Sequence, residues 1–130
     1  MSFSLSAVTQ GLALQATTPV TGFALVNGTP NVVPPWTPPN DGRMHRYIIF
    51  AQEIVTITLV GGEIAIQFTD LGGTVDTEQF SAAALTPGLY GPASFAFAQG
   101  LVKGGAPVTV SQFTALTAGT GTLWLELWGS

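Results

Sequence analysis

Apolar and polar residues alternate with a period of two along several short stretches of this 130-residue chain. Residues 54–60, IVTITLV, place Val55, Ile57 and Leu59 on one face and two threonines on the other. Residues 63–70, EIAIQFTD, alternate in the same way. A period of two is the pattern of a β-strand with one buried face. Gly61-Gly62 separates the two stretches, and because glycine tolerates positive φ, the sequence predicts a short hairpin there.

Further strand signals recur along the chain, at residues 3–8, 12–17, 20–26, 45–51, 93–99, 107–112 and 122–128. Glycine and proline separate them, and residues 85–92, LTPGLYGP, are predicted to be a connecting loop. Helical patterns are weak, and the best, residues 77–85, has room for one turn. The sequence therefore predicts one all-β domain over residues 1–130. We expect an antiparallel β-sandwich, jelly-roll-like, with about eight strands.

Charged residues are unusually scarce in this chain. They make up 8% of its residues, whereas a typical soluble domain has about 25%. A monomer with so few charges has a poorly solvated surface and tends to associate with itself. The composition therefore predicts a homo-oligomer or a component of a larger assembly.

The few charges also limit the partners and the chemistry. The formal net charge is −4, and Arg43, Arg46 and Lys103 are the only cations in the sequence. A nucleic-acid partner is not expected, because binding phosphates requires a basic surface. The chain has no cysteine, which excludes disulfides, thiolate metal sites and a cysteine nucleophile.

The N-terminal segment, residues 1–40, contains no charged residue. It has no basic start, so it is not expected to be a signal peptide. Polar residues, glycine and proline interrupt every apolar run, so no transmembrane helix and no membrane partner are predicted. An uncharged extended segment can add a strand to the sheet edge of another protein. Residues 1–40 are therefore a candidate docking arm.

Residues 31–50, NVVPPWTPPNDGRMHRYIIF, combine four prolines with Trp36, Arg43, His45 and Arg46. Proline fixes φ and lacks a backbone donor, so residues 34–39 are predicted to be a stiff, extended connector outside any central strand. Residues 40–42 are predicted to turn the chain into the strand that begins near His45. Trp36 is expected to anchor the connector against a sandwich edge or a neighbouring subunit. The two arginines are interpreted as partners for carboxylates, in the same subunit or across an interface, and the lone histidine as a structural hydrogen-bonding residue.

The last predicted strand, TLWLELW, has apolar residues on both faces. Three leucines lie on one face, while Trp124 and Trp128 lie on the other. A surface strand needs only one apolar face. The second face is therefore predicted to be covered, either by a neighbouring subunit or by another layer of the same subunit.

No catalytic residue, metal ligand set or cofactor site is predicted. A serine-type triad would have to use His45, and no Gly-x-Ser-x-Gly motif accompanies it. Asp70, Asp76 and Glu78 lack the spacing of a calcium loop and are typical of turns. Phosphate-binding glycine loops are absent from the sequence. A glycan partner stays open as the alternative, with Trp36, Trp124, Trp128 and Tyr90 as stacking platforms.

The second half of the chain resembles small β-sandwich virion proteins of tailed bacteriophages, of the capsid decoration or auxiliary structural type. The stretches that carry the resemblance are NDGRMHRYIIFAQEIVTITLVGGEIAIQFTD, GTVDTEQFSAAALTPGLYG and PVTVSQFTALTAGTGTLWLELWG, within residues 41–129. The resemblance implies a non-enzymatic protein, jelly-roll-like and commonly trimeric. Such a protein is made in the host cytoplasm and docks on the major capsid protein, or another virion protein, at the particle surface.

Together these observations predict a homotrimeric capsid decoration or stabilising protein. The alternative is a carbohydrate-binding or receptor-binding module of a phage fibre or tail. The residues predicted to form the subunit or particle interface are Trp36, Arg43, Arg46, Trp124 and Trp128.

Overall fold

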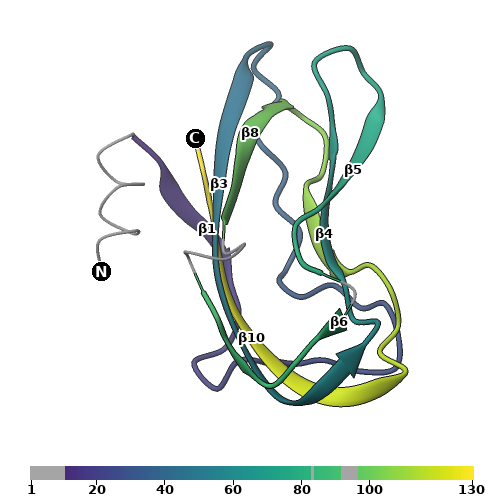
Figure 1. The fold of residues 1–130 in the computed structure, drawn as a ribbon. Helices are drawn as coiled ribbons and strands as arrows, with labels where there is room; N and C mark the ends of the chain where they lie inside the picture. The colour runs from purple at the N-terminus through teal and green to yellow at the C-terminus, as the bar shows by residue number, and fades with distance from the viewer. Residues whose placement is uncertain (1–10, 83, 92–96) are drawn as a thin grey trace.

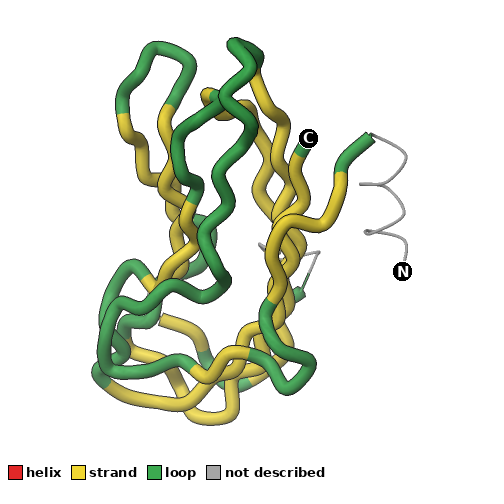
Figure 2. Tube along the Cα trace, turned by 180° about the vertical axis from the view of Figure 1, so that it is seen from behind, coloured by secondary structure: helices red, strands yellow, loops and turns green. Residues whose placement is uncertain are grey.

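The computed structural model describes residues 11–82, 84–91 and 97–130. These residues form strands and loops and no helix, as Figures 1 and 2 show. The strands are β1 (Ala13–Thr17), β2 (Phe23–Ala24), β3 (Met44–Val60), β4 (Ile64–Thr69), β5 (Val75–Gln79), β6 (Ala84–Leu85), β7 (Gly88–Tyr90), β8 (Phe97–Lys103), β9 (Thr109–Gln112) and β10 (Ala118–Gly129). Accordingly, no helix of the described part is long and apolar enough to cross a membrane.

The strands form two antiparallel sheets that face each other (Figure 1). The seven-stranded sheet has the order β1-β10-β3-β6, with β2 beside β10 and with β7 and β8 beside β3. The three-stranded sheet has the order β5-β4-β9. Residues 31–36 run antiparallel along the other side of β9, through bridges at Asn31–Ser111 and Trp36–Val108. The predicted β-sandwich is therefore confirmed.

The pairing pattern is that of a jelly roll. Four segments of the first half of the chain pair in reverse order with four of the second half: β1 with β10, residues 31–36 with β9, β3 with β8, and β4 with β5. The chain is thus one long antiparallel hairpin, with its tip at residues 70–74, rolled into two sheets. Seven of these segments are strands, and residues 31–36 are held by isolated bridges. With β2, β6 and β7, which are short additions to the seven-stranded sheet, the described residues form ten strands, against about eight predicted.

The core lies between the two sheets and follows the alternation of the sequence. Every second residue of β3 from His45 to Val55 is buried. Leu123, Leu125 and Leu127 of β10 are 0–2% exposed, as the alternation predicted. The facing sheet contributes its own buried aliphatic side chains, which are Ile64, Ile66, Val108 and Val110.

The alternation of β3 breaks near its end. Val55 and Leu59 are buried, but Ile57, predicted on the same face, is 60% exposed. The pairing of β3 with β10 shifts register twice here, between Thr120 and Gly121 and between Ala118 and Thr120. Extra residues on one strand of a pair form β-bulges, which redirect side chains and bend the strand. Figure 1 shows the resulting curve of β3 and β10.

The predicted hairpin at Gly61-Gly62 is wrong. Both glycines have positive φ, 79° and 75°, but β3 and β4 belong to different sheets and do not pair. The turn instead carries the chain from one sheet to the other. A Cβ at Gly61 would lie 2.3 Å from the Ala115 carbonyl oxygen, so close packing also requires glycine there. A glycine pair signals the turn but does not specify which strands pair across it.

The region between the predicted strands also differs from expectation. Residues 77–79 belong to β5, and residues 80–82 are not helical, so the helical turn expected over 77–85 is absent from its described part. Residues 85–92, predicted to be a loop, contain β7 and the end of β6. Both short strands pair with the bent half of β3, a contact that no local pattern encodes. The strand expected at residues 3–8 lies outside the described residues.

The proline-rich connector lies on a sheet edge, where Trp36 bridges Val108. The residues before it follow the same edge. Val32 donates its backbone N–H to the Val110 carbonyl, and Pro30 accepts a hydrogen bond from the Gln112 N–H. Proline is tolerated there because an edge strand needs backbone donors on one side only. Residues 11–40 are thus part of the sandwich itself, and residues 1–10 of the candidate docking arm lie outside the described residues.

Candidate functional site

Trp36 is buried at the end of the connector, with 7% of its surface exposed. Its backbone N–H and carbonyl both pair with Val108. The indole lies against Gly129 of β10, where an added Cβ would come within 2.2–2.7 Å of three ring carbons. Trp36 therefore anchors the connector to the sandwich of its own chain, which was one of the two anchoring sites expected.

The two tryptophans of β10 are covered by the chain that leads into and out of β1. Trp128 is 9% exposed and packs with Leu12 and Ile48 in a small apolar cluster. Its Nε1 donates to Glu126 Oε1 at 3.0 Å. Trp124 is half-buried, and its Nε1 donates to the Val20 carbonyl at 2.9 Å. The second face of β10 is thus covered within one subunit at these two positions.

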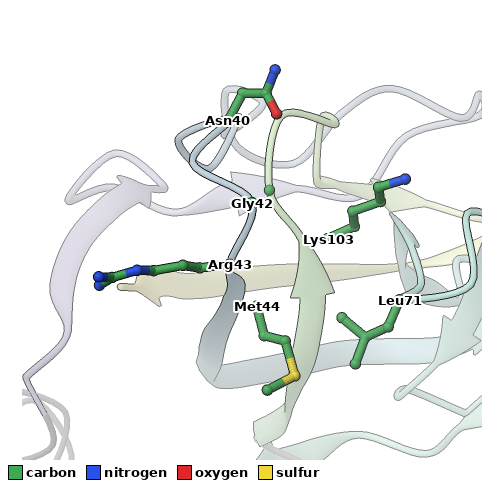
Figure 3. A pocket seen from close by; sticks show the side chains of 7 residues that line it. Asn40, Gly42, Arg43, Met44, Leu71 and Lys103 are labelled. Atoms are coloured by element: carbon green, nitrogen blue, oxygen red, sulfur yellow. The ribbon is translucent and has the colours of Figure 1, made fainter.

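Arg43 and Lys103 line an open pocket of about 320 Å³, together with Asn40, Gly42, Met44, Leu71 and Gly104. Figure 3 shows that the two cationic side chains point in opposite directions, so they do not converge on one ligand. Arg46 lies opposite Leu101 of β8, and its backbone N–H donates to Ser130 Oγ at 3.0 Å. Among the described residues, Arg43 has no carboxylate within ion-pair distance.

His45 uses both ring nitrogens in hydrogen bonds and is 5% exposed. Nδ1 lies 2.8 Å from the Ser130 carbonyl oxygen, and Nε2 lies 2.9 Å from Asp41 Oδ1. Both partners are acceptors, so the geometry favours the imidazolium, which donates from both nitrogens. The hydrogen bond to Asp41 raises the pKa of His45, and the same bond lowers the pKa of Asp41. His45 ties the turn before β3 to the end of β10.

The acidic residues at the tip of the rolled hairpin have local partners. Asp70 Oδ1 accepts the backbone N–H groups of Gly72 and Thr74, each at 2.9 Å. The bond from Thr74 holds the pKa of Asp70 below its usual value, while a side-chain hydrogen bond with Asp70 raises the pKa of Asp76. This is the turn chemistry expected from the sequence. No group of three potential metal ligands occurs among the described residues.

Glu53 is a buried ionisable residue that the sequence alone did not identify as a candidate site. It lies on the inner face of β3 and is 0% exposed. Neither carboxyl oxygen has a hydrogen-bond partner. The alternation of β3 already places position 53 in phase with Ala51 and Val55, so the sequence did contain a signal. Residue type points the other way, because a glutamate is normally exposed.

Several large apolar side chains are exposed along the bent half of β3. They are Ile54 (40% exposed), Ile57 (60%) and Val60 (51%) of β3 and Leu89 (62%) of β7, and we call them the β3 apolar strip. Ile54 and Leu89 are direct cross-strand neighbours. Because contiguous exposed apolar surface is where protein contacts form, we take this strip, with Ile54 and Leu89 adjacent in it, as the candidate protein-contact surface.

Comparison with known proteins identifies no family. No family model matches the chain, and no curated protein matches it. A similar solved structure is that of the CBM22-1 and GH10 modules of endo-1,4-β-D-xylanase 10B from Clostridium thermocellum, complexed with xylohexaose. The TM-score is 0.34 at 8% sequence identity, over 91% of this chain and 28% of that chain. A similarity this weak carries no inference about function.

Proposed function

We propose that this chain is a non-enzymatic structural protein of a phage virion, a capsid decoration or stabilising protein that forms a homotrimer. The jelly roll supports the proposal, because viral capsid proteins commonly use this architecture. The resemblance of residues 41–129 to phage auxiliary proteins points the same way. The proposed partners are further copies of this chain and the major capsid protein or another virion protein.

The observation that carries the proposal is the β3 apolar strip in a chain with so few charges. The strip consists of exposed aliphatic side chains, and threonines such as Thr56 and Thr120 lie beside it. Copies of this chain repel one another, because each has a net charge of −4. Contact between copies is therefore most favourable on a surface without charges. We assign the strip to the contact with a second copy.

Sedimentation velocity of the purified chain tests the proposal. We expect a trimer for the wild type and a monomer for Ile57→Lys, because a lysine at the contact would be buried without a partner. Val75→Lys is the matched control, because Val75 is also 60% exposed but lies on β5 of the other sheet. That variant should remain trimeric. A wild-type monomer at high protein concentration, or dissociation by both substitutions alike, would refute the assignment.

Binding to the particle is tested separately, by cosedimentation with capsids that lack the protein. Deleting residues 1–10 tests the docking arm, whereas deleting residues 1–40 would also remove β1 and Trp36 from the sandwich. Loss of particle binding by an otherwise trimeric protein would assign docking to residues 1–10. Retained binding would move the docking surface to the described part of the chain.

A glycan array addresses the carbohydrate-binding alternative. Two of the proposed stacking platforms, Trp36 and Trp128, are buried, which leaves Trp124 and Tyr90 partly exposed. Specific glycan binding that is lost in Trp124→Ala would favour the alternative over the virion proposal.

A further inference from the structure

Glu53 lies in the interior of the sandwich, in a row of side chains that crosses the seven-stranded sheet. It pairs in register with Leu123 of β10 on one side and with Tyr90 of β7 on the other. Direct cross-strand neighbours point to the same face of a sheet. Its neighbours along the inner face of β3 are Ala51 and Val55. The carboxyl group is thus surrounded within its own sheet by apolar groups and one aromatic ring.

Among the described residues, no hydrogen bond or ion pair compensates a charge on Glu53. The Tyr90 hydroxyl donates to the Thr86 carbonyl at 2.7 Å, so it is engaged elsewhere. The buried side chains of the facing sheet, Ile64, Ile66, Val108, Val110 and Gln112, carry no charge. His45 and Tyr47, the other titratable groups on the inner face of β3, lie six or more residues away along the strand. Tyr90 is therefore the one titratable side chain in register with Glu53 among the described residues.

An ionised carboxylate cannot remain in such a place without a large cost, since it loses its hydration and gains no hydrogen bond. Burial accordingly raises the pKa of Glu53 from its ordinary 4.5 to about 7. The protonated carboxyl is the form that fits the closed sandwich. Above the ordinary pKa, any opening that hydrates Glu53 becomes more favourable as the pH rises.

The path from Glu53 to water runs through β7. On the other side, Leu123 is 0% exposed and belongs to β10, a twelve-residue strand in the middle of the sheet. β7 has three residues, and its pairing with β3 covers Glu53, Ile54 and Val55. Its residues Gly88 and Leu89 are already exposed. Short strands with few buried contacts open at lower free energy than the core strands.

We propose that Glu53 is a proton-controlled latch, whose ionisation releases β7 from β3 so that the carboxylate reaches water. The protonated side chain holds the closed sandwich between β10 and β7. Deprotonation opens the sheet at this edge and leaves the β1–β10 pair and the facing sheet in place. This device follows from the burial of Glu53 and the shortness of β7. Because Leu89 of β7 also belongs to the β3 apolar strip, release of β7 would also weaken the proposed contact between copies.

Hydrogen–deuterium exchange at several pH values tests the latch. After correction for intrinsic exchange chemistry, exchange of the peptide spanning residues 84–91 should rise on the order of 50-fold from pH 5 to pH 7.5, as expected for a pKa shift of this size. Above pH 7.5 it should level off. A peptide from β10 spanning Leu123–Leu127 should show no comparable rise. Glu53→Gln, which has the same shape and no charge, should abolish the pH dependence of residues 84–91.

Three results would overturn the proposal. These are a wild-type β7 peptide with no pH dependence, an unchanged dependence in Glu53→Gln, and an equal rise in all strands, which would mean global unfolding. If Glu53→Gln does not fold, a carbon-13 NMR titration of the wild-type Glu53 carboxyl replaces it. A carboxyl that titrates near pH 4.5 would be hydrated in the native state, and the latch would then be refuted.

Discussion

The contact between Trp36 and Gly129 gives a quantitative test of how the connector is held. Gly129→Ala would place a methyl group 2.2–2.7 Å from three ring carbons of Trp36, so either the ring or β10 must move. Overpacking of this kind costs about 3 kcal/mol of unfolding free energy. Trp36→Ala removes a ring that is 7% exposed, and truncation of a buried tryptophan costs about 4 kcal/mol.

The double variant distinguishes this contact from two independent defects. Once the ring is gone, the methyl group at position 129 has room, so the double variant should lose about 4 kcal/mol, against about 7 kcal/mol if the effects added. Urea unfolding followed by far-UV circular dichroism measures all four proteins. The four proteins should be compared at one protein concentration and at pH 5.5. Otherwise differences in oligomerisation and in the titration of ionisable groups would also change the measured free energy of unfolding.

Trp124→Ala serves as the control for loss of an indole. Trp124 is half-buried and packs beside Gly22 rather than Gly129. This substitution should cost less than Trp36→Ala and should add to Gly129→Ala without coupling. The reasoning is refuted if Trp36→Ala and Gly129→Ala add within about 0.5 kcal/mol, the usual limit for independent sites.

Three further substitutions test other parts of the fold. Gln112→Leu should destabilise the protein by about 2–3 kcal/mol in urea unfolding, since the buried amide bonds to Val26 and Gly28; an effect within error would contradict these bonds. Gly119→Ala should destabilise the protein more than Gln112→Leu does, because φ at Gly119 is +93° and an added Cβ would clash with the Thr58 carbonyl. In a Glu53→Gln background, stability should fall as the pH rises through the raised pKa of His45. The bond to Asp41 supplies that stability below pH 6.5, and His45→Gln should remove the dependence.

Residue patterning alone predicts the class of fold and much of the core. Alternation along β3 and β10 identifies their buried faces, because successive side chains of a strand point to opposite sides. The prolines of the connector exclude it from a central strand, and it lies at a sheet edge. These inferences succeed because each depends on the chemistry of neighbouring residues alone.

The candidate site was less accessible to sequence reasoning. Tryptophans on the outer face of β10 indicated a covered surface, but the sequence left open what covers them. The structure places Leu12 against Trp128 and the Val20 carbonyl against Trp124, both from the start of the described chain. The sequence is ambiguous at Glu53, because its residue type favours exposure whereas its phase in the strand favours burial.

Strand pairing, in contrast, depends on long-range packing. β1 lies beside β10 from the opposite end of the chain, whereas β3 and β4, adjacent in sequence, lie in different sheets. The same long-range packing produces the β-bulges in the β3–β10 pair, leaves Ile57 exposed and buries Glu53. Local patterns fix the direction of side chains along a strand, but pairing and enclosure depend on the free energy of the whole assembled sandwich.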